Sequence, residues 1–91
     1  MDFEWDEEKE RKNRAVHGFT FEDAARAFLD PFHEVIFDSR MNYGEERLTV
    51  FGMVQERLLA VTYTVRGETI RIISARKASR HERRQYEDQK I

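Results

Sequence analysis

The sequence has no cysteine, which excludes both a disulfide framework and a metal site built on thiolates. This composition is compatible with a reducing compartment. No apolar run approaches the roughly 20 residues that a membrane-spanning helix needs. The N-terminal segment MDFEWDEEKE is acidic, whereas the start of a signal peptide is basic. We therefore predict a soluble, cytoplasmic protein that makes no contact with a membrane.

The sequence also lacks the recurring motifs of enzyme sites. The three histidines, His17, His33 and His81, match no metal-ligand spacing. There is no phosphate-binding loop or dinucleotide glycine motif, and the four glycines fit turns and helix ends. The three serines lack the setting of a nucleophile elbow. We predict no metal and no cofactor, and these patterns by themselves identify no enzyme.

What the sequence does have is charge that is segregated along the chain. Its 91 residues predict one small domain, residues 1–91. Residues 1–65 carry 14 acidic and 8 basic side chains, whereas residues 66–91 carry 4 acidic and 8 basic ones. The basic C-terminal part is a candidate surface for nucleic acid. The alternative is an ordinary solvated surface, which is what charge runs on short helices usually are.

Capping residues and hydrophobic periodicity predict an α+β fold. An extended segment at 2–5 precedes a helix that starts after Asp6 and stops at Gly18. A second helix starts at Thr20 and ends at Asp30-Pro31. Its periodicity predicts that it buries Phe21, Ala24, Ala25 and Phe28.

Four strand candidates follow, separated by SRMNYG, VQE and GE. They are Glu34–Phe37, Glu46–Met53, Arg57–Arg66 and Thr69–Arg76. We expect a small antiparallel sheet, with the two N-terminal helices packed on one face and a short C-terminal helix at its edge.

Two tight turns predict how the last three strands pair. A turn at Gly67-Glu68 sets Thr64 opposite Arg71, and a turn at Gln55-Glu56 sets Arg47 opposite Thr64. The resulting row places two cations about 10 Å apart and suits a run of phosphates. The alternative is that an open antiparallel sheet simply has a polar, wet outer face. The other face is apolar and should be covered by the helices: Leu48, Val50, Leu59, Val61, Tyr63, Val65, Ile70 and Ile72.

The C-terminal helix has a clear start and little to bury. Ser79 and Glu82 have the spacing of a capping box, and Tyr86 is the only large apolar group in RHERRQYEDQK. Such a helix is marginal by itself, so its position must come from the sheet edge, a partner or RNA. We expect it to serve more as a surface than as part of the core.

Several stretches together resemble the BrnT family of toxins from bacterial type II toxin–antitoxin modules. The N-terminal stretches are WDEEK at 5–9, Asn13, and His17-Gly18 with FEDA at 21–24. The later ones are GEER at 44–47 followed by Gly52, and VTYTVRGETIRIISARKASRHERRQYE at 61–87. The sequence departs from the family at Val16, where a lysine is usual. The resemblance implies a RelE-like ribonuclease toxin that cleaves RNA without a metal, inhibits translation and is held inactive by a BrnA-type antitoxin. It implies a hetero-oligomer that reaches DNA only through the antitoxin.

The resemblance also implies site residues. Arg71 and Arg76 come first as catalytic residues, then Arg47, with His17 and Glu46 as proton-transfer candidates. The expected reaction is attack of an RNA 2′-hydroxyl on its neighbouring phosphate, where arginine stabilises the phosphorane. Arg66, Arg80 and Thr64 are the predicted RNA contacts, and Arg83, Arg84 and Tyr86 the predicted antitoxin contacts. A non-catalytic RNA-binding or antitoxin-binding module is the rival function.

Each catalytic assignment has a structural alternative. His17 could act only as a cation at the end of its helix. Glu46 lies on the covered face in the predicted register, where it could pair with Lys9 or Arg76. Arg76 falls by parity on the face opposite Arg71, so either the strand ends before Arg76 or Arg76 anchors the C-terminal helix. Tyr63 is expected in the core.

Overall fold

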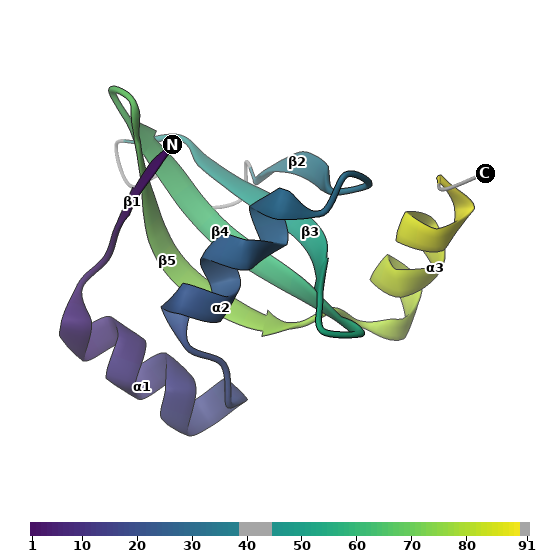
Figure 1. The fold of residues 1–91 in the computed structure, drawn as a ribbon, viewed down its shortest axis with the longest axis horizontal. Coiled ribbons are helices and arrows are strands. Elements are labelled where there is room, and N and C mark those ends of the chain that lie inside the picture. The colour runs from purple at the N-terminus through teal and green to yellow at the C-terminus, as the bar shows by residue number, and fades with distance from the viewer. Residues whose placement is uncertain (39–44, 90–91) are drawn as a thin grey trace.

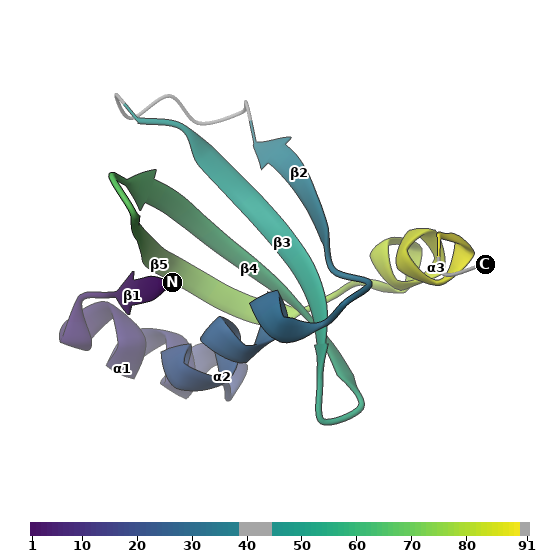
Figure 2. The same cartoon turned by 45° about the horizontal axis from the view of Figure 1, so that its top comes forward.

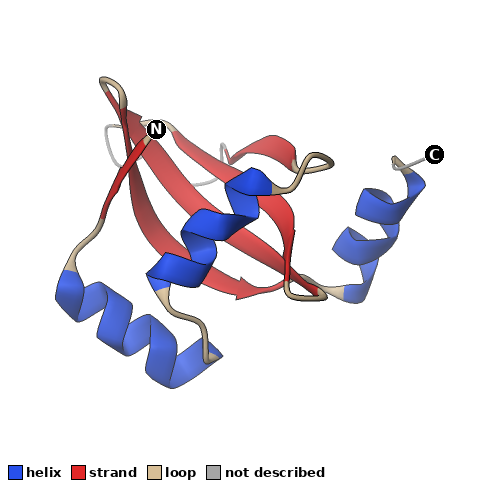
Figure 3. Cartoon of the chain, in the orientation of Figure 1, coloured by secondary structure: helices blue, strands red, loops and turns tan. Residues whose placement is uncertain are grey.

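The computed structural model describes residues 1–38 and 45–89, so the predicted turn SRMNYG lies outside the described residues. Within these residues the chain forms three helices and five strands, in the order β-α-α-β-β-β-β-α (Figures 1 and 3). The elements are β1 (Asp2–Glu4), α1 (Glu7–His17), α2 (Phe21–Arg26) with a 3₁₀ turn η1 (Ala27–Leu29), β2 (Glu34–Asp38), β3 (Arg47–Val54), β4 (Arg57–Arg66), β5 (Thr69–Lys77) and α3 (Arg80–Asp88).

The helix starts are set by the side chains that the sequence predicted. Asp6 accepts hydrogen bonds from the backbone N–H groups of the first turn of α1, and Thr20 does the same for α2. Ser79 and Glu82 form a reciprocal capping box at α3. Gly18 ends α1 in the left-handed conformation, with φ +82°.

The sheet is mixed, so the expectation of a purely antiparallel sheet is wrong. Its strand order is β1-β5-β4-β3-β2, and β1 runs parallel to β5. The other three pairings are antiparallel. Hairpin reasoning reaches only strands that are neighbours in the sequence, whereas the pairing of β1 with β5 is closed by the whole intervening chain.

The predicted register of β3, β4 and β5 is confirmed. Leu48 lies opposite Tyr63, Thr64 opposite Arg71 and Tyr63 opposite Ile72. At the β4–β5 turn only Gly67 has positive φ, as a II′ turn requires at its first position. The β3–β4 turn instead has positive φ at both Gln55 and Glu56, a I′ pattern formed without glycine.

The core lies between α2 with η1 and one face of the sheet, and Figure 2 shows α1 and α2 on the same side of the sheet. Most of the predicted apolar face is buried, but Val65 is 53% exposed because it lies near the hairpin end of β4. Phe21 and Ala24 of α2 are fully buried, whereas Ala25 and Phe28 pack at the margin of the core. Tyr63 is in the core, where Phe28 packs edge-on against its ring.

Helix α1 is fixed to the sheet by one polar side chain. Asn13 donates to the carbonyl of Ala75 (2.9 Å) and accepts from the N–H of Ala75 (3.0 Å), so its amide pairs with β5 as a residue of a neighbouring strand would. Its amide also donates to the carbonyl of Phe19. Because these groups are buried, losing them would leave unsatisfied backbone atoms.

Helix α3 packs on the sheet face opposite α2, here called the outer face, and not merely at the sheet edge. Tyr86 is 2% exposed and forms a second apolar cluster with Phe51, Leu58 and Ala60. Its hydroxyl donates to the carboxylate of Asp30. The expectation that α3 buries almost nothing therefore missed its one deep anchor.

Gly52 allows η1 to approach β3. A Cβ atom on Gly52 would lie 2.1 Å from the carbonyl oxygen of Ala27, which is backbone and cannot turn away. We predict that Gly52→Ala lowers the free energy of unfolding by about 1–3 kcal/mol, as overpacked cores do. Urea unfolding measures the change.

The matched control is Gly18→Ala, where a Cβ meets nothing within 4 Å and the cost is only that of a positive φ. That variant should lose about 1 kcal/mol. A Gly52→Ala variant as stable as the parent would mean that η1 does not press on β3 in solution.

Candidate functional site

A row of polar side chains crosses the outer face of the sheet. Thr64 lies opposite Arg71, and continuing the β3–β4 register sets Arg47 on the other side of Thr64. The Thr64 side chain is 2% exposed, and its hydroxyl donates to the carbonyl of Glu46 (2.7 Å). Thr64 thus fixes the start of β3 against β4 and has almost no surface left for RNA. It holds the two arginines about 10 Å apart.

The parallel strand β1 adds a carboxylate to this row that sequence reasoning missed. Glu4 lies opposite Arg71, and Arg71 Nη1 donates to Glu4 Oε2 (2.8 Å). Both side chains are partly exposed, 40% for Glu4 and 30% for Arg71. The alternation in Asp2–Trp5 was the available signal, because Phe3 packs against the core and so directs Glu4 outward.

A β-bulge decides the position of Arg76. Tyr63 pairs with Ile72 and Thr62 pairs with Ser74, so Ile73 is an extra residue in β5. One inserted residue reverses the alternation that follows it. Arg76 consequently lies opposite Ala60, on the same outer face as Arg71. The expectation that Arg76 lies on the face opposite Arg71 is therefore wrong. The alternative that the strand ends before Arg76 is also wrong, because β5 continues to Lys77.

The other alternative, that Arg76 anchors the C-terminal helix, is confirmed. Its Nη1 and Nη2 donate to the two carboxylate oxygens of Glu82 at 2.9 and 3.0 Å. Glu82 also accepts from the backbone N–H of Ser79 (2.8 Å). The hydrogen bonds from Arg76, with a smaller contribution from that N–H, lower the pKa of Glu82 to about 2. The same pair raises the pKa of Arg76.

Asp30 connects α3 to the core. Its carboxylate accepts from the backbone N–H groups of Met53 (2.7 Å) and Phe32 (2.9 Å) and from the Tyr86 hydroxyl. Burial, and then the bond to Asp30, raise the pKa of Tyr86 to about 12. Tyr86 therefore stays protonated as a donor, and an antitoxin could touch its ring only if α3 moved.

The two predicted proton-transfer residues lie apart from this arrangement. His17 is exposed at the C-terminal end of α1, whereas Asp6 lies at the other end. The backbone N–H groups of Lys9 and Glu8 lower the pKa of Asp6, and the nearby charge of Arg71 adds a smaller contribution. The 11-residue helix separates the two ends by about 16 Å. Glu46 is exposed just before β3, so the expectation that it lies on the covered face is wrong. Its predicted partner Arg76 binds Glu82 instead.

The remaining predicted contacts form two exposed groups. Arg66 lies at the hairpin end of β4, where it pairs weakly with Glu45 (3.4 Å). Arg80 and Arg83 line a broad hollow with Lys77 where β5 meets α3. Arg84 is exposed on the same helix. The predicted RNA contact Arg80 and the predicted antitoxin contact Arg83 therefore share one basic surface.

Residues 5–82 match the family of the BrnT ribonuclease toxins of type II toxin–antitoxin systems. The chain belongs to this family. Membership implies an RNA target and an antitoxin partner for a BrnT toxin. A search of curated proteins found no match.

Two further properties of the described residues concern membranes and metals. No helix in the described part of the chain is long and apolar enough to cross a membrane. Among residues 1–38 and 45–89, no three His, Cys, Asp or Glu side chains gather as metal ligands do. The groups that meet on the outer face are instead arginines and carboxylates, which bind and polarise phosphate and accept protons.

The Arg76–Glu82 pair predicts a pH dependence. The pKa of Glu82 is about 2 in the folded chain and near 4.5 when unperturbed, so the pair stabilises fully above pH 4.5 and loses its contribution as the pH falls towards 2. Glu82→Gln should therefore be less stable than the parent at pH 7, and this difference should shrink by pH 2.5. Urea unfolding at pH 7, 4 and 2.5 measures it.

Glu87→Gln is the matched control, because Glu87 is 57% exposed and lies 3.8 Å from Arg83. Its stability should differ little from the parent at any pH. If the gap between parent and Glu82→Gln stays constant from pH 7 to 2.5, the ion pair does not hold α3.

Proposed function

We propose that the chain is a metal-independent endoribonuclease whose site is the outer face around Arg47, Arg71 and Arg76. The observation that carries this proposal is the bulge at Ile73, which brings Arg76 to the face that already holds Arg71. Three guanidinium groups then share one face of a rigid sheet. Arginine suits the role because its fork binds one phosphate through two hydrogen bonds and remains charged throughout.

The proposed reaction is an internal transesterification. The RNA 2′-oxygen bonds to the adjacent phosphorus, the bond from phosphorus to the 5′-oxygen breaks, and the products are a 2′,3′-cyclic phosphate and a 5′-hydroxyl. A base takes the proton of the 2′-hydroxyl, and an acid protonates the leaving 5′-oxygen. The arginines stabilise the extra negative charge of the phosphorane.

Glu4 is the best-placed base, because its carboxylate contacts Arg71 directly. A phosphate that binds Arg71 would displace part of this ion pair and leave the carboxylate beside the 2′-hydroxyl. Glu46 adjoins Arg47 in the sequence and is the second candidate. His17 is the weakest candidate, since it lies at the far end of α1.

A non-catalytic binding module is the second candidate function. It is favoured by the fact that Arg71 and Arg76 each already have a carboxylate partner, Glu4 and Glu82. Two neutralised arginines would bind RNA weakly and stabilise a phosphorane poorly. In that case the fold would serve mainly to bind the antitoxin.

Product analysis separates the two functions. The purified chain, freed of its partner, should leave 2′,3′-cyclic phosphate ends on RNA in the presence of EDTA. Arg71→Ala should fold normally and cleave about 10²–10³-fold more slowly, the loss typical of a transition-state charge donor. Rates on a labelled oligonucleotide measure the effect.

Arg57→Ala is the matched control, because Arg57 stacks over the ring of Phe19 rather than joining the row. It should cleave at the parental rate. If the parent produces no cyclic phosphate, the chain is a binding module; if Arg71→Ala cleaves as fast as the parent, Arg71 is not in the site.

A BrnA-type antitoxin, in this proposal, inhibits the toxin by covering the basic surface of α3. Arg80, Arg83 and Arg84 are exposed or partly exposed there, next to Arg76 at the edge of the site. Acidic antitoxin residues would bind them and keep RNA away. The complex would be a hetero-oligomer that contacts DNA only through the antitoxin. The free toxin would act in the cytoplasm and inhibit translation by cleaving RNA.

We predict that antitoxin binding slows hydrogen exchange in residues 76–89 and abolishes RNA binding in the same titration. In the free chain α3 should exchange faster than β4, because its attachment to the sheet centres on Tyr86 and on the Arg76–Glu82 pair. Mass spectrometry with competition by a short RNA measures both effects. A complex that still binds RNA with undiminished affinity would contradict this mode of inhibition.

A further inference from the structure

Exposed apolar side chains concentrate around the strand β2. Of the eight large apolar side chains that are exposed in the described part of the chain, five lie within residues 29–37. Exposed apolar side chains that gather in one region favour a binding role there. The five side chains are Leu29, Phe32, Val35, Ile36 and Phe37.

The same strand is an open edge of the sheet. Strand β2 is last in the strand order and, among the described strands, pairs only with β3. Natural sheets protect such edges with proline, lysine, bulges or a covering segment. The β2 sequence EVIFD has neither proline nor lysine. Within residues 1–38 and 45–89, no backbone group bonds to the outward side of β2, which can therefore pair with another strand.

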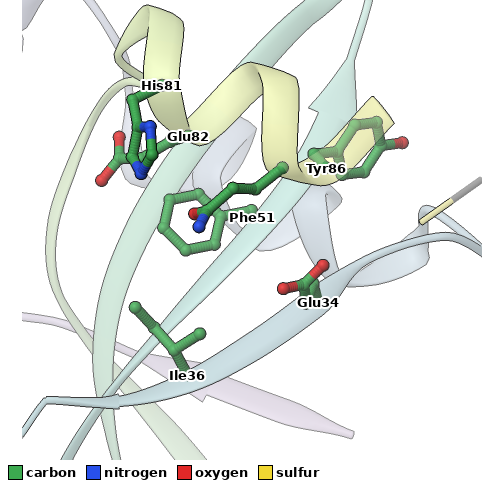
Figure 4. A pocket seen from close by; sticks show the side chains of 7 residues that line it. Glu34, Ile36, Phe51, His81, Glu82 and Tyr86 are labelled. Carbon is green, nitrogen blue, oxygen red and sulfur yellow. The ribbon is translucent and has the colours of Figure 1, made fainter. Parts of the chain in front are cut away.

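A pocket of about 170 Å³ adjoins this edge on the outer face, between β2 and α3. Figure 4 shows Glu34 and Ile36 on β2, Phe51 at the back of the pocket, and Tyr86 and His81 on α3. Since Glu34 and Ile36 belong to the edge strand itself, a chain segment lying along β2 would extend a side chain into the pocket.

Glu34 gives the pocket its chemical preference. Its Oε2 atom is buried and has no hydrogen-bond partner within residues 1–38 and 45–89. A buried carboxylate oxygen without a partner is costly, and a positively charged donor is its best complement. The apolar walls formed by Ile36 and Phe51 suit the methylene stem of a lysine or arginine.

We propose that an extended segment of the antitoxin adds to the sheet along β2 and inserts a lysine or arginine side chain into this pocket, against Glu34. The proposal rests on the toxin function given above and names a second contact of the same partner, separate from the basic surface of α3. Main-chain hydrogen bonds would supply affinity, and alternate side chains would supply specificity. The segment would also cover Val35, Ile36 and Phe37.

A second copy of the chain is a poorer occupant of this edge. Strand β2 starts and ends with an acidic residue in the sequence. Antiparallel pairing of two copies about Ile36 would set position 34 of one copy opposite position 38 of the other, acid against acid. Like charges directly opposite each other destabilise a strand pair.

The test measures the affinity of the antitoxin, the product of the reading frame adjacent to the toxin gene, for toxin variants by calorimetry. Glu34→Gln should weaken binding roughly 10- to 100-fold through the loss of one charged hydrogen bond. Ile36→Ser should weaken it about five- to tenfold through lost apolar burial. Parental affinity in both variants overturns the proposal.

Two control variants make comparable substitutions away from β2. Val65→Ser removes a side chain of similar exposure from the hairpin end of β4, and Glu68→Gln neutralises an acid in the adjacent turn. Both should bind the antitoxin like the parent. Equal losses of antitoxin affinity in these controls and in the β2 variants would mean a general effect of charge or surface. That result would overturn the proposed binding in the pocket.

Strand addition has its own signature in backbone exchange. In the free ¹⁵N-labelled chain, the outward amides of β2 should exchange rapidly, whereas the amides between them are already paired to β3 and should exchange slowly. In the complex, exchange of the outward amides should slow at least tenfold. Unchanged β2 amides in the complex overturn strand addition. A concentration-dependent dimer of the free chain that Ile36→Ser abolishes also overturns it, in favour of a second copy.

Cleavage of RNA by the free variants separates this inference from the proposed function. Glu34→Gln and Ile36→Ser should cleave at the parental rate, because β2 is not part of the arginine row. If both variants cleave RNA and bind the antitoxin with parental affinity, the β2 site is wrong and the proposed ribonuclease function stands. If the parent does not cleave RNA but both variants bind the antitoxin more weakly than the parent, the ribonuclease function is wrong and the β2 site stands.

Discussion

The bulge at Ile73 and the ion pair that follows it connect the site to the C-terminal helix. By inserting one residue into β5, the bulge turns Arg76 to the outer face, where its guanidinium meets both oxygens of Glu82. Without the bulge, the Arg76 side chain would point towards α2 and the core, and α3 would lose its charged anchor. The same residue therefore stands at the border between the polar row, which we propose binds phosphate, and the helix that carries the basic surface.

The outer face of the sheet is divided into two parts with different tasks. Near the β4–β5 hairpin and β1 it holds Glu4, Arg71 and Thr64, a polar row open to solvent on either side of the buried Thr64. Towards the other end of β3 and β4 it becomes apolar, and Tyr86 packs there. An RNA that bound both the row and Arg76 would reach α3, so a partner bound to α3 would compete with it.

Local sequence signals predicted the parts of this fold that depend on neighbouring residues. Caps such as Asp6 and Ser79 and turns such as Gly67-Glu68 act within a few residues, and their predictions are confirmed. A bulge has no side-chain signature in RIISARK, so its effect on Arg76 could not be predicted. The parallel pairing of Glu4 with Arg71 and the burial of Tyr86 depend on contacts between distant segments, which no periodicity records.

In the proposed function, RNA phosphates bind the arginines of the outer face. The most direct measurement follows the side-chain Nε–Hε signals of a ¹⁵N-arginine-labelled chain during titration with a short 2′-O-methyl RNA, which cannot be cleaved. The signals of Arg47, Arg71 and Arg76 should shift most, while those of Arg14 on α1 and Arg26 on α2 should stay nearly constant. Large shifts at Arg14 and Arg26 with unmoved signals at Arg71 and Arg76 would contradict it.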